Sequence, residues 1–132
     1  MKYEKKPTFF EEIKEIRRFF KTSKKEREIV FYAEHGGYWP TFEGLISELN
    51  GRGSKFSYVT SSWSDPILDS RNSPIEPFYI NKLMSFFAQL IDSRVFIMTL
   101  SDLNNHYIKK SRHPVHYVYV FHALVSTHMV YN

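Results

Sequence analysis

The chain contains no cysteine among its 132 residues. It therefore has no disulfide framework and no thiolate that could serve as a nucleophile or metal ligand, and this favours the cytosol as its compartment. Long apolar runs are missing as well, because none approaches the roughly 20 residues that a bilayer-spanning helix needs. Lysines and glutamates are scattered through residues 1–20, so we expect no signal peptide there.

Two short enzyme motifs are also absent. The glycine pair Gly36-Gly37 lacks the G-x-G-x-x-G spacing of a dinucleotide-binding loop, and no serine lies in a G-x-S-x-G turn. What is present is typical of one globular domain, with 42% hydrophobic and 17% aromatic residues. The net charge of +4 favours an anionic partner, which could be a phosphorylated ligand, an anionic lipid or a nucleic acid.

Residues 8–21 are predicted to form an amphipathic helix. Thr8 and Glu11 have the spacing of a capping box. Apolar residues recur in steps of three and four, at Phe9, Phe10, Ile13, Ile16, Phe19 and Phe20. The opposite face is predicted to carry Glu12, Lys14, Glu15, Arg17, Arg18 and Lys21. The favoured hypothesis packs the apolar stripe against a sheet, and the alternative lays the helix on an anionic membrane surface.

The rest of the chain alternates between strands and helices. We predict strands at residues 28–33, 55–60, 77–80, 94–99 and 115–121, with helices at about 41–50, 82–92 and 101–110. This order predicts an α/β fold with a Rossmann-like open, mostly parallel sheet of about five strands. We divide the chain into residues 1–26, an amphipathic helix with a basic linker, and residues 27–132, the α/β domain.

Two strands have a predicted place in the sheet. Pro77 opens the third strand, and a proline is tolerated at a sheet edge or at the start of a strand. The last strand, residues 115–121, is almost continuously β-branched or aromatic. We expect it to be a central strand that is covered on both faces.

The carboxyl ends of parallel strands share one edge of the sheet, and ligands bind at this edge in open α/β folds. Residues that follow the predicted strands are Glu34, His35, Gly36, Gly37, Thr60, Asp65, Thr99, Asp102 and His122. The loop with two glycines either brings backbone amides close to an anion or simply forms a tight turn. His122 is the best acid–base candidate, and its alternative is a core histidine bonded to a backbone carbonyl.

Metal and nucleic-acid sites are not expected. The six histidines include the pairs His113/His116 and His122/His128, but neither pair has a third ligand at a characteristic spacing. A basic cluster at Lys109, Lys110, Arg112 and His113 precedes the last strand and would lie at the amino edge of the sheet, as a solvated loop. No nucleic-acid reader motif accompanies it.

Four segments taken together resemble a known family. Residues 29–49, 58–61, 95–103 and 116–131 are similar, in order and spacing, to the N-terminal part of the CDP-glycerol glycerophosphotransferases, the teichoic-acid polymerases and primases. The resemblance implies a GT-B arrangement of two Rossmann-like domains, with CDP-glycerol on the C-terminal domain and the acceptor on the N-terminal one. It also implies that His122 deprotonates the acceptor hydroxyl, although Ala123 stands where the family often has glycine.

The resemblance therefore implies an acceptor-side domain, truncated before its donor domain, of an enzyme that transfers glycerol phosphate to a membrane-linked polyol phosphate or surface glycan. We expect such a chain to be inactive alone and to need no cofactor, and CDP-glycerol would contact only the missing domain. The implied acceptor-binding residues are Glu34, His35, Gly36, Gly37, Thr60, Ser126 and His128. The expected location is cytoplasmic, with the first helix suited to the inner face of the cell membrane.

Two other hypotheses stay open from the sequence. One is a stand-alone, non-catalytic α/β module that binds an anionic ligand or partner. The other is a remnant of a decaying gene, which would expose the unpaired face of its last strand and aggregate.

Overall fold

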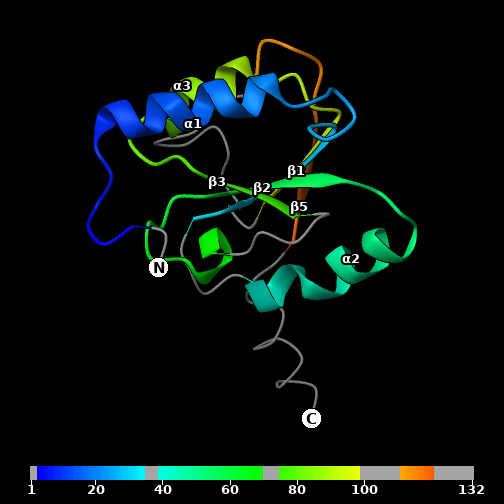
Figure 1. The fold of residues 1–132 in the computed structure, drawn as a ribbon. Helices are drawn as coiled ribbons and strands as arrows, with labels where there is room; N and C mark the ends of the chain where they lie inside the picture. The colour runs from blue at the N-terminus through cyan, green and yellow to red at the C-terminus, as the bar shows by residue number, and fades with distance from the viewer. Residues whose placement is uncertain (1–2, 35–38, 70–74, 99–110, 121–132) are drawn as a thin grey trace, which may run out of the picture.

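The chain folds, in a computed structural model, as a five-stranded sheet between two layers of helices (Figure 1). The structure describes residues 3–34, 39–69, 75–98 and 111–120. The strands are β1 (Ile29–Ala33), β2 (Phe56–Thr60), β3 (Ile75–Tyr79), β4 (Val95–Met98) and β5 (His116–Tyr119). The helices are α1 (Phe9–Lys21), α2 (Trp39–Gly51), α3 (Met84–Leu90) and the short 3-10 helix η2 (Pro66–Asp69).

The sheet is all-parallel, with the strand order β3-β2-β1-β4-β5. The chain runs outward from β1 through β2 to β3 and then returns to the other side of β1 for β4 and β5. This doubly wound order reverses direction between β1 and β4. The predicted α/β class with a Rossmann-like open parallel sheet is therefore confirmed.

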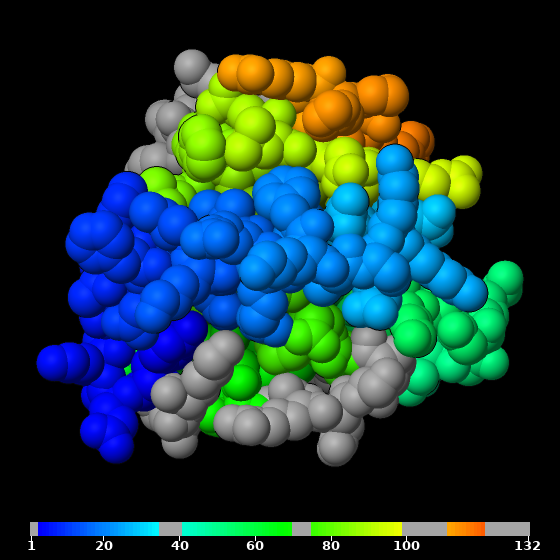
Figure 2. Space-filling view, turned by 45° about the horizontal axis from the view of Figure 1, so that its top comes forward, coloured from blue at the N-terminus to red at the C-terminus, as the bar shows by residue number. Residues whose placement is uncertain are grey.

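Helices cover both faces of the sheet, and each face has its own apolar core. α1 and α3 lie side by side on one face, while α2 and η2 lie on the other (Figure 1), and α1 runs across the surface of its layer in Figure 2. Along β1, Val30 and Tyr32 point to the α1 and α3 layer, whereas Phe31 and Ala33 point to the α2 layer. Strands buried on two faces need apolar residues at every position, which explains the continuous apolar runs.

Aromatic rings join α1 and α3 to the sheet. The ring of Phe19 lies edge-on to Phe78 of β3 and Phe87 of α3, with centroids 5.4 and 4.9 Å away. Phe19 is fully buried, so the preferred hypothesis for the first helix, packing on the sheet, holds for its C-terminal half. The predicted capping box is also present, because Thr8 Oγ1 accepts from the Glu11 N–H and the Glu11 side chain accepts from the Thr8 N–H.

The predicted division of α1 into an apolar inner face and a charged outer face is wrong at four positions. Glu12 and Glu15 are buried, whereas Phe9 and Phe10 are 46% and 72% exposed. The reason lies in what α1 covers. Beneath it are backbone groups of β3 and of the turn into α3, and these polar groups need partners.

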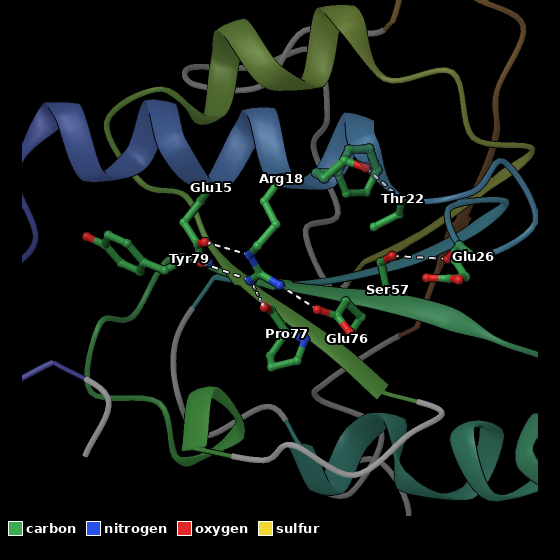
Figure 3. A network of polar contacts seen from close by, with 9 residues as sticks. Glu15, Arg18, Thr22, Glu26, Ser57, Glu76, Pro77 and Tyr79 are labelled. Atoms are coloured by element: carbon green, nitrogen blue, oxygen red, sulfur yellow. Dashed lines mark hydrogen bonds and ion pairs between the residues drawn. The ribbon is translucent and has the colours of Figure 1, made fainter.

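Side chains of α1 are hydrogen-bond partners of backbone groups at the edge of β3 (Figure 3). Tyr79 donates its backbone N–H to Glu15 Oε1 at 3.2 Å, and the Pro77 carbonyl accepts from Arg18 Nη2 at 2.5 Å. Arg18 also pairs with Glu15 and with Glu76. The helix thereby binds two backbone groups of a strand edge that would otherwise offer them unpaired. The sequence left two places open for Pro77, a sheet edge or the start of a strand, and within the described residues the structure shows the edge, with Pro77 inside β3.

The turn into α3 is held in the same way by Glu12. Its Oε1 accepts from the backbone N–H groups of Asn81, at 2.8 Å, and Leu83, at 3.0 Å. Two buried carboxylates therefore bind backbone donors rather than cations alone, which is how a buried polar group is retained in a core.

The expectation that the last strand is central is wrong. Within the described residues β5 is the outermost strand, paired only with β4, and its side chains are exposed or half-buried. Tyr117 and Tyr119 pack at the border of one core, and Val118 and Val120 at the border of the other. The continuous apolar run thus reflects cover above and below the sheet. It carries no information about a strand on each side.

Candidate functional site at the carboxyl edge of the sheet

The register aligns the carboxyl ends of the strands. Ala33 of β1 is level with Thr60 of β2, which is level with Tyr79 of β3. On the other side, Tyr32 is level with Met98 of β4, which is level with Tyr119 of β5. All five strands therefore end at one edge, and the reversal of strand order between β1 and β4 marks the place where ligands bind in folds of this kind.

A chain of hydroxyl groups ties the ends of three strands together. The Tyr32 hydroxyl lies 2.7 Å from Ser61 Oγ, and Ser61 Oγ donates to the Ile80 carbonyl at 2.7 Å. Because the serine proton goes to Ile80, the tyrosine is the donor in the first bond. Ser61 also donates its backbone N–H to the Ala33 carbonyl at 3.0 Å. This serine therefore holds the three strand ends in register.

A second set of bonds shapes the loop after β2. Asp65 is 4% exposed, and its Oδ2 accepts from Thr60 Oγ1 at 2.8 Å. Its Oδ1 accepts from the Ile67 N–H at 3.1 Å, at the start of η2. Burial raises the pKa of Asp65 above its ordinary value, and the two hydrogen bonds only partly oppose that rise. The loop after β2 thus contains a 3-10 helix that is fastened to the strand end by Asp65.

The structure describes two of the predicted acceptor-binding residues. Thr60 is completely buried, and its hydroxyl both donates to Asp65 and accepts from the Ser62 N–H at 3.1 Å. In this arrangement its side chain supports the loop. Glu34 follows directly after β1, is partly buried, and stands next along the chain to Ala33, the register partner of Thr60. These two residues therefore belong to neighbouring strand ends.

The other predicted site residues lie outside the described residues: His35, Gly36, Gly37, Thr99, Asp102, His122, Ser126 and His128. The described chain comes closest to His122 at Val120, which donates its backbone N–H to the Met98 carbonyl at 2.8 Å. This bond brings the last described residue to the carboxyl edge, two positions before the histidine.

Sequence reasoning missed Tyr32. It lies within an apolar strand and is 3% exposed, so its pattern is that of a core aromatic residue. Only its hydroxyl group signalled another role, because a buried tyrosine usually needs a hydrogen-bond partner. Asp65 was identifiable from the sequence as a polar residue in the loop, but its bond to Thr60 was not.

The opposite, amino edge of the sheet has fewer features of a binding site. An open hollow of about 350 Å³ is lined by Arg94, Pro114, Val115 and His116. The described part of the basic cluster, Arg112 and His113, is exposed just before β5, at the edge where it was expected. Among the described residues no group of three or more histidines, aspartates or glutamates could hold a metal ion.

The candidate site is thus a hydrogen-bonded strand edge of the Rossmann-like type, defined by Tyr32, Thr60, Ser61 and Asp65. No protein-family model matches the chain, and no curated protein or solved structure is significantly similar to it.

Proposed function

We propose that this chain is the acceptor-side domain of a glycerophosphotransferase-like enzyme, which transfers glycerol phosphate from CDP-glycerol to a membrane-linked polyol phosphate or surface glycan. The observation that supports the proposal is the common edge at which the strands end. Residues 29–49, 58–61, 95–103 and 116–131 carry the resemblance to that family, and each segment contains the carboxyl end of one strand, β1, β2, β4 or β5. The segments that resemble the family therefore leave the sheet on the side where such folds bind ligands.

In this proposal His122 is the general base. A neutral imidazole takes the proton of an acceptor hydroxyl, whose oxygen then attacks the β-phosphorus of CDP-glycerol, and CMP leaves. The donor is held by a second domain, so the present chain alone binds the acceptor without transferring to it. The edge position of β5 removes the support that a central strand would have added, and the common strand edge carries the proposal instead.

Acceptor binding can be tested on the chain as it is. We would titrate it with a water-soluble glycerol phosphate oligomer and follow the backbone amide signals by NMR. We expect shifts at Glu34, Thr60 and Ser61, at the carboxyl edge. Arg94 and His116, at the amino edge, serve as internal controls. Shifts confined to the amino edge, or none at millimolar oligomer, would contradict the proposal.

The role of His122 is tested in a full-length enzyme of the resembled family. Replacing the histidine that corresponds to His122 by alanine should slow transfer from CDP-glycerol by roughly a hundredfold to ten-thousandfold, because the general base is lost. Acceptor affinity should change little. Transfer at nearly the parent rate would remove this residue from the mechanism.

One observation favours the alternative of a non-catalytic binding module. The described polar side chains at the carboxyl edge, Tyr32, Thr60, Ser61 and Asp65, bond to one another or to backbone groups. Such an edge is built for rigidity. A module of this kind would bind the oligomer with an affinity that His122→Ala leaves unchanged, and no added donor domain would produce transfer.

A further inference from the structure

The acidic side chains of α1 are less exposed to solvent than most of its basic side chains. Its three glutamates all accept hydrogen bonds from backbone N–H groups: Glu11 in the capping box, Glu12 from the turn into α3, and Glu15 from β3. Lys14, Arg17 and Lys21, in contrast, are exposed. These three cations are spaced three and four residues apart, so they form one stripe on the face turned away from the sheet. The outward stripe carries positive charge without an acidic residue in it.

Aromatic side chains extend this stripe at the N-terminal end of the helix. Phe10 stands four residues before Lys14 and is 72% exposed, and Phe9 beside it is 46% exposed. Their rings meet edge-on with centroids 5.8 Å apart. On the neighbouring helix α3, Phe86 is 55% exposed. Three of the four exposed large apolar side chains in the described part of the protein therefore lie in the layer formed by α1 and α3; the fourth is Leu45, on α2.

The described residues leave the outer face of α1 uncovered. In Figure 2 the helix lies lengthwise across the front of the molecule, with α3 beside it. No helix in the described ranges is both long and apolar enough to traverse a bilayer. A surface that combines a cationic stripe with exposed rings along one helix suits the boundary between lipid headgroups and acyl chains.

We propose that the outer face of α1, made of Phe9, Phe10, Lys14, Arg17 and Lys21, binds the surface of an anionic membrane. The helix lies in the plane of the interface, the cations face lipid phosphates, and the two phenylalanines enter the headgroup region. Glu12 and Glu15 do not oppose this contact, because they are buried and bonded to backbone N–H groups, and Glu11 is engaged in the capping box.

Charge decides against a second copy of the chain as the occupant. In a two-fold symmetric contact the stripe would meet itself and place cations opposite cations. A nucleic acid would satisfy the cations but would give the exposed phenylalanines no apolar environment in a duplex. An anionic bilayer accommodates both groups at once.

The inference deepens the proposed function and rests on it in one respect. The membrane-linked acceptor of the proposed function gives this domain a reason to contact a membrane. The two can fail separately. If vesicle binding is absent while the oligomer still shifts Glu34 and Thr60, this inference alone is overturned. If the protein binds vesicles but not the oligomer, only the proposed function is overturned.

Co-sedimentation with vesicles tests the proposal. The protein should partition onto vesicles of equal parts phosphatidylglycerol and phosphatidylcholine, and far more weakly onto pure phosphatidylcholine. Salt should weaken the binding through screening. The triple variant Lys14→Gln, Arg17→Gln, Lys21→Gln should lower the partition coefficient on the order of a hundredfold, because each basic residue near an anionic surface contributes roughly a fivefold gain.

A matched control removes the same charge elsewhere. The triple variant Arg52→Gln, Arg94→Gln, Arg112→Gln carries three exposed substitutions outside α1 and should bind within about threefold of the parent. Phe10→Ser should weaken binding by about tenfold, whereas Leu45→Ser on α2 should not weaken it. All four positions altered on α1 are exposed, so circular dichroism and thermal unfolding should match those of the parent.

Four results would overturn the proposal. The first is absence of binding to anionic vesicles at low salt, and the second is equal loss in the two triple variants. The third is binding of single-stranded DNA or heparin as tight as vesicle binding and unaffected by Phe10→Ser, since that would indicate a site that reads charge alone. The fourth is a dimer, seen by light scattering without vesicles, that Phe10→Ser dissociates.

Discussion

Asp65 shows how one buried carboxyl group organises the carboxyl edge of β2. It accepts from a hydroxyl group on the strand and from a backbone N–H of η2, so it connects strand and loop. Its pKa is raised by burial, which means that the ionised form is disfavoured in the folded protein. The same residue therefore holds the loop through hydrogen bonds and lowers stability through its charge.

Two substitutions at Asp65 separate these effects. Asp65→Ala should lower the free energy of unfolding by about 1–3 kcal/mol, because the Ile67 N–H and Thr60 hydroxyl lose their acceptor. Asp65→Asn keeps one acceptor and removes the charge. A raised folded-state pKa of a carboxyl group contributes stability at low pH, and this contribution is lost as the pH rises through that pKa. The free energy of unfolding of the asparagine variant should therefore rise relative to that of the parent between acidic and neutral pH. Urea unfolding near pH 4 and at neutral pH measures both. If the free energy of unfolding of the asparagine variant instead fell relative to that of the parent over this pH range, the raised pKa of Asp65 would be contradicted.

Asp92 presents the opposite case. Its Oδ1 and Oδ2 lie 3.1 and 3.4 Å from Arg27 Nε and Nη2, in a pair that joins the segments after α1 and α3. Burial alone would raise the pKa of Asp92, but the hydrogen bond and charge of Arg27 lower it below the ordinary value of 3.8. A lowered carboxyl pKa contributes stability above the unfolded-state value and loses it as the pH falls through the folded-state value.

Asp92→Asn should therefore cost roughly 1 kcal/mol at neutral pH and make the protein less sensitive to acid. The parent should lose more of its free energy of unfolding than the variant as the pH falls below 3.8. Urea unfolding at neutral pH and at two acidic values gives the comparison. Parallel pH profiles for parent and variant would show that the ion pair does not contribute.

At the scale of elements, α1 serves as the cover of β3. The strand has a proline whose missing N–H suits an edge, and two of its outward groups, the Tyr79 N–H and the Pro77 carbonyl, bind Glu15 and Arg18. The guanidinium of Arg18 also lies 4.0 Å from the centre of the Phe78 ring, a cation–π arrangement within the same contact. A polar helix face over a strand edge protects the sheet from pairing with another chain.

Glu15→Ala tests the cover. The Tyr79 N–H loses its acceptor and Arg18 loses a partner, so the free energy of unfolding should fall by about 1–3 kcal/mol. Self-association should increase as well, because the edge is less protected. Urea unfolding and light scattering measure the two effects. Glu43→Ala, at an exposed position of α2, is the control and should change neither. An increase in light scattering shared by both variants would refute the edge argument.

At the scale of the whole molecule, the strand order places β1 in the middle of the sheet and β5 at its border. Val30, Phe31 and Ala33 of β1 are fully buried, whereas the β5 side chains are exposed or half-buried. Local opening requires less free energy where fewer apolar contacts are broken. Stability should therefore decrease from the centre of the sheet toward β5.

Amide hydrogen exchange should reveal this gradient. We expect the slowest exchange in β1, and exchange at least tenfold faster in β5, since roughly 1.4 kcal/mol less opening free energy corresponds to tenfold. The measurement is mass spectrometry or NMR on the native protein. Protection in β5 equal to that in β1 would mean that the border of the sheet is covered by another segment.

Much of this architecture could be predicted from the chain itself. The capping box at Thr8 and Glu11 and the alternation of strands and helices follow from local spacing and propensity, whereas Pro77 left a sheet edge and a strand start both open. The inward glutamates could not be predicted in this way. Glu12 and Glu15 belong to a polar pattern that usually faces solvent, and only the backbone donors of Tyr79, Asn81 and Leu83 beneath them reverse that expectation. Of the candidate site, sequence reasoning identified Thr60 and Asp65 but neither their mutual bond nor Tyr32.

Local patterns along the chain are enough to predict that this protein alternates strands with helices and builds a parallel sheet, because periodicity, β-branching and caps are properties of neighbouring residues. The order of the strands, the outer place of β5 and the side of α1 on which Glu12 and Glu15 lie are known from the folded structure alone. Those features depend on which backbone groups of distant segments lack partners once the sheet has formed, and no local pattern records that.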